Sequence, residues 1–137
     1  MADSRKVDVV INSIINGEKI VIKSIGEYRL SDGNHIIVFN HNDQNYVTKY
    51  AIKASKENML LKRLGAIKGD MLFDISKQTE TRYETMGLSH DFIINTNSYF
   101  IKEDNNSIVI ETEYLLSDKS PLEPIKTNQT ITINCRD

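Results

Sequence analysis

Apolar side chains recur at every second position along several short stretches of the chain. In the first of these, Val7, Val9 and Ile11 alternate with residues that include Asp8. A period of two is typical of a β-strand with one buried face, because successive side chains point to opposite faces. The pattern therefore predicts strands, at 6–15, 19–30, 35–40, 45–54, 59–64, 71–76, 79–86, 92–101, 108–117 and 126–135.

Short turns separate these segments. Asn16-Gly17 and Asp32-Gly33 each lie between two predicted strands, and both pairs accept the positive φ angles of a type I′ hairpin turn. Successive strands with short connections predict an antiparallel meander. Because a strand that bends at a bulge can be counted twice, we expect about eight strands rather than ten.

Composition favours the same class of structure. Ile occurs 19 times and Ala only 4 times, and β-branched side chains pack well on a pleated surface. The stretch 51–65 allows a second interpretation, because Leu60, Leu61 and Leu64 before Gly65 also fit a short helix with a glycine cap. The residues alone leave open whether 51–65 is strand or helix.

A meander of this size has to protect its two edge strands, and closing the sheet into a barrel removes them. The sequence therefore predicts an all-β, antiparallel up-and-down barrel. An open β-sandwich is the alternative, because hairpin patterns do not distinguish closure from two packed sheets. The chain shows no linker or internal repeat, so we expect a single domain over 1–137.

Charge and targeting signals narrow the partners. The 17 Lys and Arg residues against 19 Asp and Glu residues give a net charge of −2, so no nucleic-acid partner is predicted. Cys135 is the one cysteine, which excludes a disulfide within the chain and a Cys-based zinc site. No apolar run suits a secretory signal or a membrane span, so we expect a cytoplasmic protein without a membrane partner.

From Tyr46 to the C-terminus the sequence resembles the YwiB-like family, a group of small bacterial proteins of unknown function. The likeness is carried by Arg63-x-Gly65, Met71-x-Phe73, Tyr83-x-Thr85-x-x-Gly87, Thr96, Ile108-x-Ile110 leading to Tyr114, and Asn128 ahead of Thr130-Ile131-Thr132. The resemblance implies a calycin-like, or lipocalin-like, eight-stranded barrel in a bacterial cytoplasmic protein. It makes 59–64 a strand, and it implies no substrate, cofactor or catalytic residue.

The stretch 79–117 contains more polar residues than an apolar core needs. Alternation groups four hydroxyl-bearing side chains, which line one patch of the interior if they point inward: Tyr83, Thr85, Thr112 and Tyr114. A small barrel holds one small ligand, and a few convergent polar groups in an apolar cavity suit a binding site. With an arginine and two asparagines added, the candidate ligand-binding residues are Arg63, Tyr83, Thr85, Asn95, Asn97, Thr112 and Tyr114.

Each of these residues also has a structural interpretation. Thr is a good strand residue, and inward Tyr hydroxyls commonly bond to backbone or water. Arg63 alternates with Met59 and Leu61, so its guanidinium either binds an anionic group or bonds carbonyl groups at one end of the barrel. The sequence leaves open whether the polar patch is a site or only structural.

Signals for metal or covalent chemistry are weak. His35, His41 and His90 lie in or beside predicted turns without the spacing of metal ligands, so no metal site is predicted. The chain has no Gly-x-Ser-x-Gly elbow, P-loop or dinucleotide fingerprint. We therefore predict no cofactor and assign no catalytic residue.

Three classes of function remain. The first is non-catalytic binding of an unidentified small, partly apolar molecule in the barrel interior or mouth, which needs a cavity. The alternative is a protein–protein interaction or homo-oligomeric module, such as a homodimer with a filled barrel, which needs an exposed apolar patch. The third is an enzyme of unknown reaction, which needs a titratable group beside a cavity.

Overall fold

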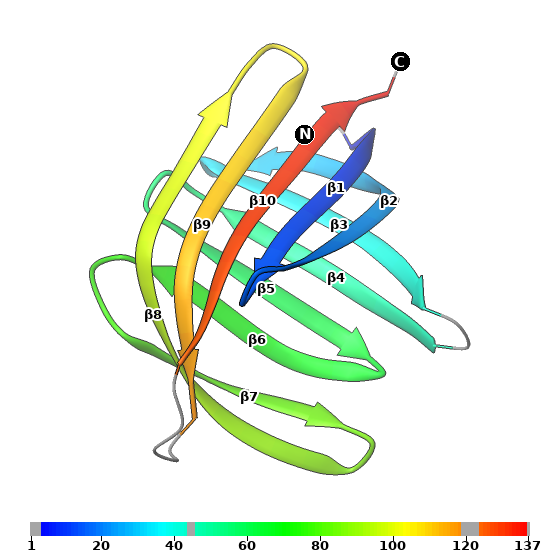
Figure 1. Cartoon of the computed structure of the whole chain (residues 1–137). Helices are drawn as coiled ribbons and strands as arrows, with labels where there is room; N and C mark the ends of the chain where they lie inside the picture. Colours follow the sequence, from blue (N-terminus) through cyan, green and yellow to red (C-terminus); the bar gives the residue numbers. More distant parts are fainter. Residues whose placement is uncertain (1–3, 44–45, 119–123, 137) are drawn as a thin grey trace.

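The structure is a computed structural model that describes residues 4–43, 46–118 and 124–136, and ten strands form one sheet in it (Figure 1). The strands are β1 (Arg5–Ile15), β2 (Glu18–Ser31), β3 (Asn34–Asp43), β4 (Tyr46–Ala54), β5 (Asn58–Gly65), β6 (Ile67–Asp74), β7 (Thr79–Thr85), β8 (Leu88–Glu103), β9 (Ser107–Ser117) and β10 (Ile125–Cys135). The described residues contain no helix, so none of them forms a helix long and apolar enough to cross a membrane.

The sheet is a closed antiparallel meander. Every strand pairs with the next one along the chain, and β10 pairs with β1 in a register that runs from Val7 opposite Cys135 to Ile15 opposite Thr127. The prediction of a closed barrel is therefore confirmed, and the open β-sandwich is excluded. Closure leaves no edge strand over most of the barrel, which is how a sheet of this size avoids pairing with other chains.

The expected number of about eight strands is wrong, because all ten segments are separate strands. No strand is counted twice at a bulge. The structure has a register shift between Thr96 and Ser98, but it lies inside β8, which the sequence pattern already treats as one strand. Each of the ten segments instead pairs with its neighbours as a strand of its own.

The stretch 51–65 is strand and not helix. Apart from the connection at 55–57, its residues belong to β4 and β5, which pair from Thr48 opposite Gly65 to Ala54 opposite Met59. A glycine does end the segment, but for a different reason from a helix cap. Gly65 has φ +136°, and a Cβ atom there would lie 2.3 Å from the Val47 carbonyl oxygen, so a larger residue would clash with β4.

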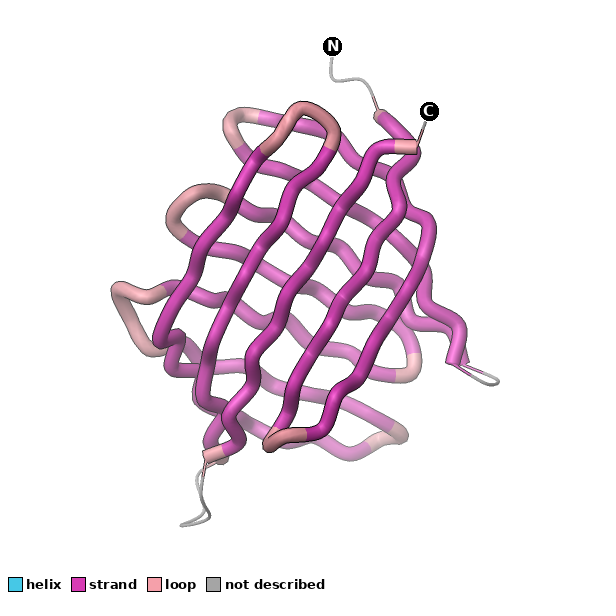
Figure 2. The backbone as a smooth tube through the Cα atoms, turned by 45° about the horizontal axis from the view of Figure 1, so that its top comes forward, coloured by secondary structure: helices cyan, strands magenta, loops and turns pink. Residues whose placement is uncertain are grey.

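The barrel is flattened, with two layers of strands that cross at an angle. Strands β9, β10 and β1 form one layer, and β3 to β6 run behind them (Figures 1 and 2). The long strands β2 and β8 bend from one layer to the other. Between the layers lies the core, in which Val7, Val9 and Ile11 of β1 are buried as the period of two predicts.

Candidate functional site

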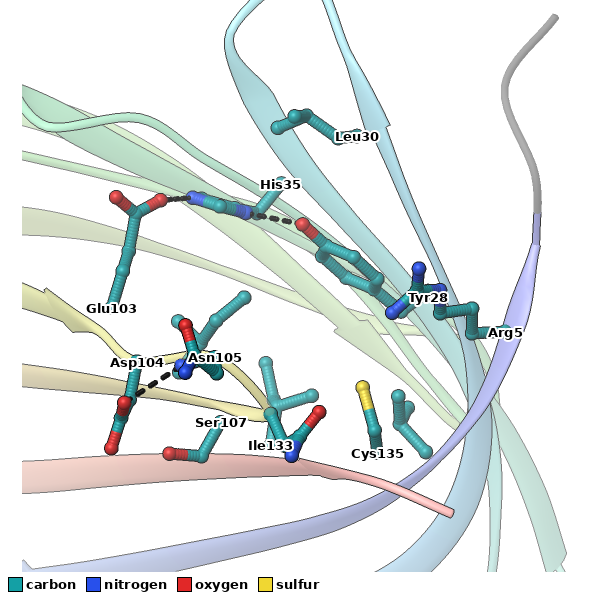
Figure 3. Close-up of a pocket in the computed structure, with 13 residues that line it drawn as sticks. Arg5, Tyr28, Leu30, His35, Glu103, Asp104, Asn105, Ser107, Ile133 and Cys135 are labelled. Carbon is teal, nitrogen blue, oxygen red and sulfur yellow. Dashed lines mark hydrogen bonds and ion pairs between the residues drawn. The ribbon is translucent and has the colours of Figure 1, made fainter. Parts of the chain in front are cut away.

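One end of the barrel carries a pocket of about 420 Å³ beside the chain termini (Figure 3). Its floor is apolar and is formed by Val7 of β1, Ile108 of β9 and Ile133 of β10, whose side chains belong to the core. Polar side chains stand around this floor, namely Arg5, Tyr28, His35, Glu103 and Cys135, among others. A pocket with an apolar floor and a few polar groups is the usual form of a small-molecule site.

Three of these polar residues form a chain of contacts. The Tyr28 hydroxyl lies 2.7 Å from His35 Nδ1, and His35 Nε2 contacts the Glu103 carboxylate (Figure 3). A carboxylate accepts hydrogen bonds, so the imidazole donates from Nε2, and in its neutral form its Nδ1 accepts the Tyr28 proton. The Tyr28 oxygen then has a lone pair left that can accept a hydrogen bond from a ligand.

The hairpin between β2 and β3 brings two members of this chain together. Tyr28 and His35 lie on opposite sides of the Asp32-Gly33 turn, and their rings stack with centroids 5.7 Å apart. Asp32 and Gly33 both have positive φ angles, as the sequence predicts for this type of turn. Glu103 is the last residue of β8 and lies on the other side of the pocket.

The electrostatics of the pocket keep Tyr28 protonated. Burial raises the pKa of Tyr28 above its ordinary value, the Glu103 carboxylate raises this pKa further, and Arg5 opposes the shift. The His35 side chain is almost fully buried, whereas that of Glu103 is about half exposed. A protonated phenol at neutral pH is suited to hydrogen bonding and not to proton abstraction.

The sequence patterns described above do not predict a site at this pocket. His35 lies beside a predicted turn, but it has the same parity along its strand as the core residues Ile37 and Phe39. That parity is the signal that predicts an inward imidazole. No comparable signal exists for Glu103, because the bulge at Thr96–Ser98 changes which residues of β8 face inward beyond it.

The predicted polar patch is found in part, in the interior toward the other end of the barrel. The Arg63 guanidinium lies over the Tyr83 ring, 4.6 Å from its centroid. On β9, Thr112 and Tyr114 are buried on the inner face. Burial raises the pKa of Tyr114 to about 12, with the nearby Tyr83 adding to the shift.

The other predicted residues do not join this cluster. Asn95 follows Ile94, which is completely buried, so Asn95 points away from the interior. Asn97 sits in the β8 bulge and is exposed. Beyond the bulge Tyr99 faces inward, and its hydroxyl donates to the Ser55 carbonyl. Thr85 is half-buried at the end of β7, opposite Ile67.

The fold defines the chain as a small all-β protein, a closed ten-stranded antiparallel barrel with a pocket at one end. The family described as "Domain of unknown function (DUF1934)" matches residues 6–130. The chain therefore belongs to this family. A comparison with curated proteins finds no match.

Among solved structures, the crystal structure of the YwiB protein from Bacillus subtilis is similar to this chain. The TM-score is 0.84, with 20% sequence identity over 98% of this chain and 94% of the other. The resemblance to a YwiB-like family of unknown function, inferred from the sequence, is thereby confirmed. At this level of identity the likeness shows the fold alone.

Proposed function

We propose that this protein binds a small, partly apolar molecule without catalysing a reaction, and that the ligand occupies the pocket at the barrel mouth. The observation that carries the proposal is the Tyr28–His35–Glu103 chain of contacts beside an apolar floor. The apolar part of a ligand would cover Val7, Ile108 and Ile133. A hydroxyl or amine group on it would donate to the Tyr28 oxygen or to the Glu103 carboxylate.

The chemistry of the pocket favours binding over catalysis. A tyrosine that acts as a base or nucleophile needs a lowered pKa, whereas burial and the Glu103 charge raise the pKa of Tyr28. The one thiol of the chain, that of Cys135, lies in the same pocket. The two ring nitrogens of His35 contact Tyr28 and Glu103 instead of this thiol. The polar groups are thus arranged to orient a ligand.

One observation favours a homo-oligomeric module as a second candidate. The pairing between β2 and β3 begins at Gly26 opposite Phe39, so the first half of β2 pairs with β1 alone. Along this half Ile20, Val21 and Ile25 are between 42% and 52% exposed. A strand segment that pairs along one edge only and carries exposed apolar side chains is suited to pairing with a second copy.

Native mass spectrometry tests both candidates at once. The protein is purified gently from a bacterial host under reducing conditions, and native and denaturing spectra are compared. We expect a monomer that carries a reproducible additional mass, lost on denaturation. A Ser107→Trp variant, which fills the pocket from its rim, is expected to lose that mass, and the matched Ser89→Trp variant at the other end of the barrel is expected to keep it.

The same spectra can also contradict the proposal of ligand binding. A dimer of the bare chain, dissociated by Val21→Lys, would support the homo-oligomeric module instead. A monomer that carries no additional mass in either the wild-type protein or Ser107→Trp would contradict both candidates.

A further inference from the structure

The interior of the barrel contains an arginine that has no carboxylate partner among the described residues. Arg63 faces inward on β5, two positions beyond the buried Leu61. Its Nη2 donates to the Met71 sulfur at 3.6 Å, and its Nε is buried with no hydrogen-bond partner among the described residues. Because a buried donor needs a matching acceptor, the Nε–H of Arg63 is left unsatisfied by the described residues, although the guanidinium also contacts Tyr83.

A second strong donor points at the same sulfur. The Tyr83 hydroxyl donates to Met71 Sδ at 2.7 Å. A thioether sulfur is only a weak acceptor. A guanidinium and a phenol therefore converge on a position that would suit a much stronger acceptor. The Nε–H and one Nη2–H of Arg63 lie on the same edge of the guanidinium, and this edge binds a carboxylate or phosphate through two parallel hydrogen bonds.

The backbone around Arg63 makes room for this arrangement. Gly69 lies directly opposite Arg63 on β6, and a Cβ atom at Gly69 would lie 3.0 Å from Tyr83 Cδ1 and 2.8 Å from the Arg82 carbonyl oxygen. Only glycine therefore lets the Tyr83 ring pack beside Arg63 without displacement. The missing side chain is what brings the two donors together.

The cluster also lies behind the weakest part of the barrel wall. Strands β6 and β7 pair through two residue pairs only, Ile67 with Thr85 and Lys68 with Glu84. Further along, the Thr81 hydroxyl donates to the Asp70 carbonyl, so a side chain replaces backbone pairing there. Arg63 and Tyr83 are both partly exposed, so the cluster is not fully sealed from solvent.

The geometry points to an oxoanion site in the barrel interior: Arg63 Nε and Nη2 and the Tyr83 hydroxyl bind the carboxylate or phosphate group of a small molecule, at the position that Met71 Sδ holds in this structure. The site is separate from the mouth pocket and does not depend on it. Burial raises the pKa of Tyr83 although the Arg63 charge opposes the shift, so the hydroxyl carries its proton and donates at neutral pH.

Methionine methyl NMR tests the site directly. Protein labelled with ¹³C at the Met ε-methyl groups is titrated with sodium butyrate or with inorganic phosphate, at an ionic strength held constant with sodium chloride. We expect one of the two anions to shift the Met71 signal saturably, because the anion takes the donors from its sulfur. Met59, fully buried elsewhere in the core, and Met86, 86% exposed, serve as internal controls.

Two variants establish which groups bind the anion. Arg63→Gln is expected to abolish the saturable shift, and Tyr83→Phe is expected to weaken the affinity roughly tenfold or more, as for loss of one hydrogen bond to a charged group. If Arg63→Gln does not fold, Tyr83→Phe alone decides. A response to butyrate only assigns a carboxylate, and a response to phosphate only assigns a phosphate group.

Two results would overturn the proposal. One is a Met71 signal that neither anion moves, or moves only in proportion to the exposed Met86. The other is a saturable shift that persists unchanged in Tyr83→Phe and in folded Arg63→Gln.

Discussion

Replacing Phe73 by Ala is expected to lower the free energy of unfolding by about 3–5 kcal/mol, the range measured for a large aromatic side chain removed from a core. Phe73 on β6 is completely buried. Its ring lies 4.6 Å from that of Tyr114 on β9, measured between centroids. The residue therefore joins the two layers of the barrel, and its loss leaves a cavity between them.

The measurement is urea-induced unfolding of the wild-type protein and the variant. Phe100→Ala is the matched control, because Phe100 is 55% exposed on the outer face and its removal is expected to cost well under half the Phe73 effect. Equal losses of stability for the two variants would contradict the placement of the core between the layers.

The barrel is also expected to lose stability in alkaline solution, through Tyr114. The pKa of Tyr114 is raised to about 12 in the folded chain against an ordinary value of 10.0. As the pH rises above 10, the unfolded chain therefore loses this proton while the folded chain keeps it, which stabilises the unfolded state. The contribution is fully present below pH 10 and is lost by about pH 12, and the two-unit shift corresponds to about 2–3 kcal/mol.

Unfolding at pH 9 and pH 11 measures this effect. Other groups titrate in the same range, so the useful quantity is the difference between wild-type protein and Tyr114→Phe. We expect the wild-type protein to lose about 1 kcal/mol more than the variant between these two pH values. Tyr46→Phe, which removes an exposed hydroxyl, should behave like the wild-type protein. Identical pH dependence in all three would show that Tyr114 is not buried as described.

Much of the fold could be predicted because it depends on local patterns. The alternation in Val7–Ile11 and the Asn16-Gly17 and Asp32-Gly33 turns indicate strands and hairpins directly, and the positive φ angles of these turns are found. Strand bounds were less accurate: β6 begins at Ile67, whereas the pattern predicted residue 71. The apolar alternation weakens there because Gly69 and Asp70 interrupt it.

The candidate site could be predicted only in part, because one bulge in β8 changes which residues face inward. Parity along β7 and β9 correctly grouped Tyr83 with Tyr114, because both strands are regular. In β8 the extra residue at Thr96–Ser98 reverses parity, so Asn97 could not be placed from the sequence pattern. For the same reason the inward direction of Glu103 could not be predicted. Its contact with His35 joins residues 68 positions apart in the sequence.

The two ends of the barrel thus differ in chemistry. The mouth pocket offers acceptors, the Tyr28 oxygen and the Glu103 carboxylate, over an apolar floor. The interior cluster offers donors, from Arg63 and Tyr83. A ligand with a donor group is therefore expected at the mouth, and an anionic group is expected at the interior cluster, so that ligands with the two kinds of group distinguish the sites.

Isoleucine methyl NMR tests the central claim, ligand binding at the mouth, most directly. Ile108 and Ile133 line the pocket, whereas the buried Ile52 does not line it and the exposed Ile20 lies on β2 away from it. Protein labelled at the Ile δ1-methyl groups is titrated with cyclohexanol, benzyl alcohol and benzylamine. We predict saturable shifts of Ile108 and Ile133 for at least one of these probes, weakened in Tyr28→Phe and absent in Ser107→Trp. Spectra in which no probe moves these two methyl groups, or in which Ile52 and Ile20 move equally, would contradict a binding site at the barrel mouth.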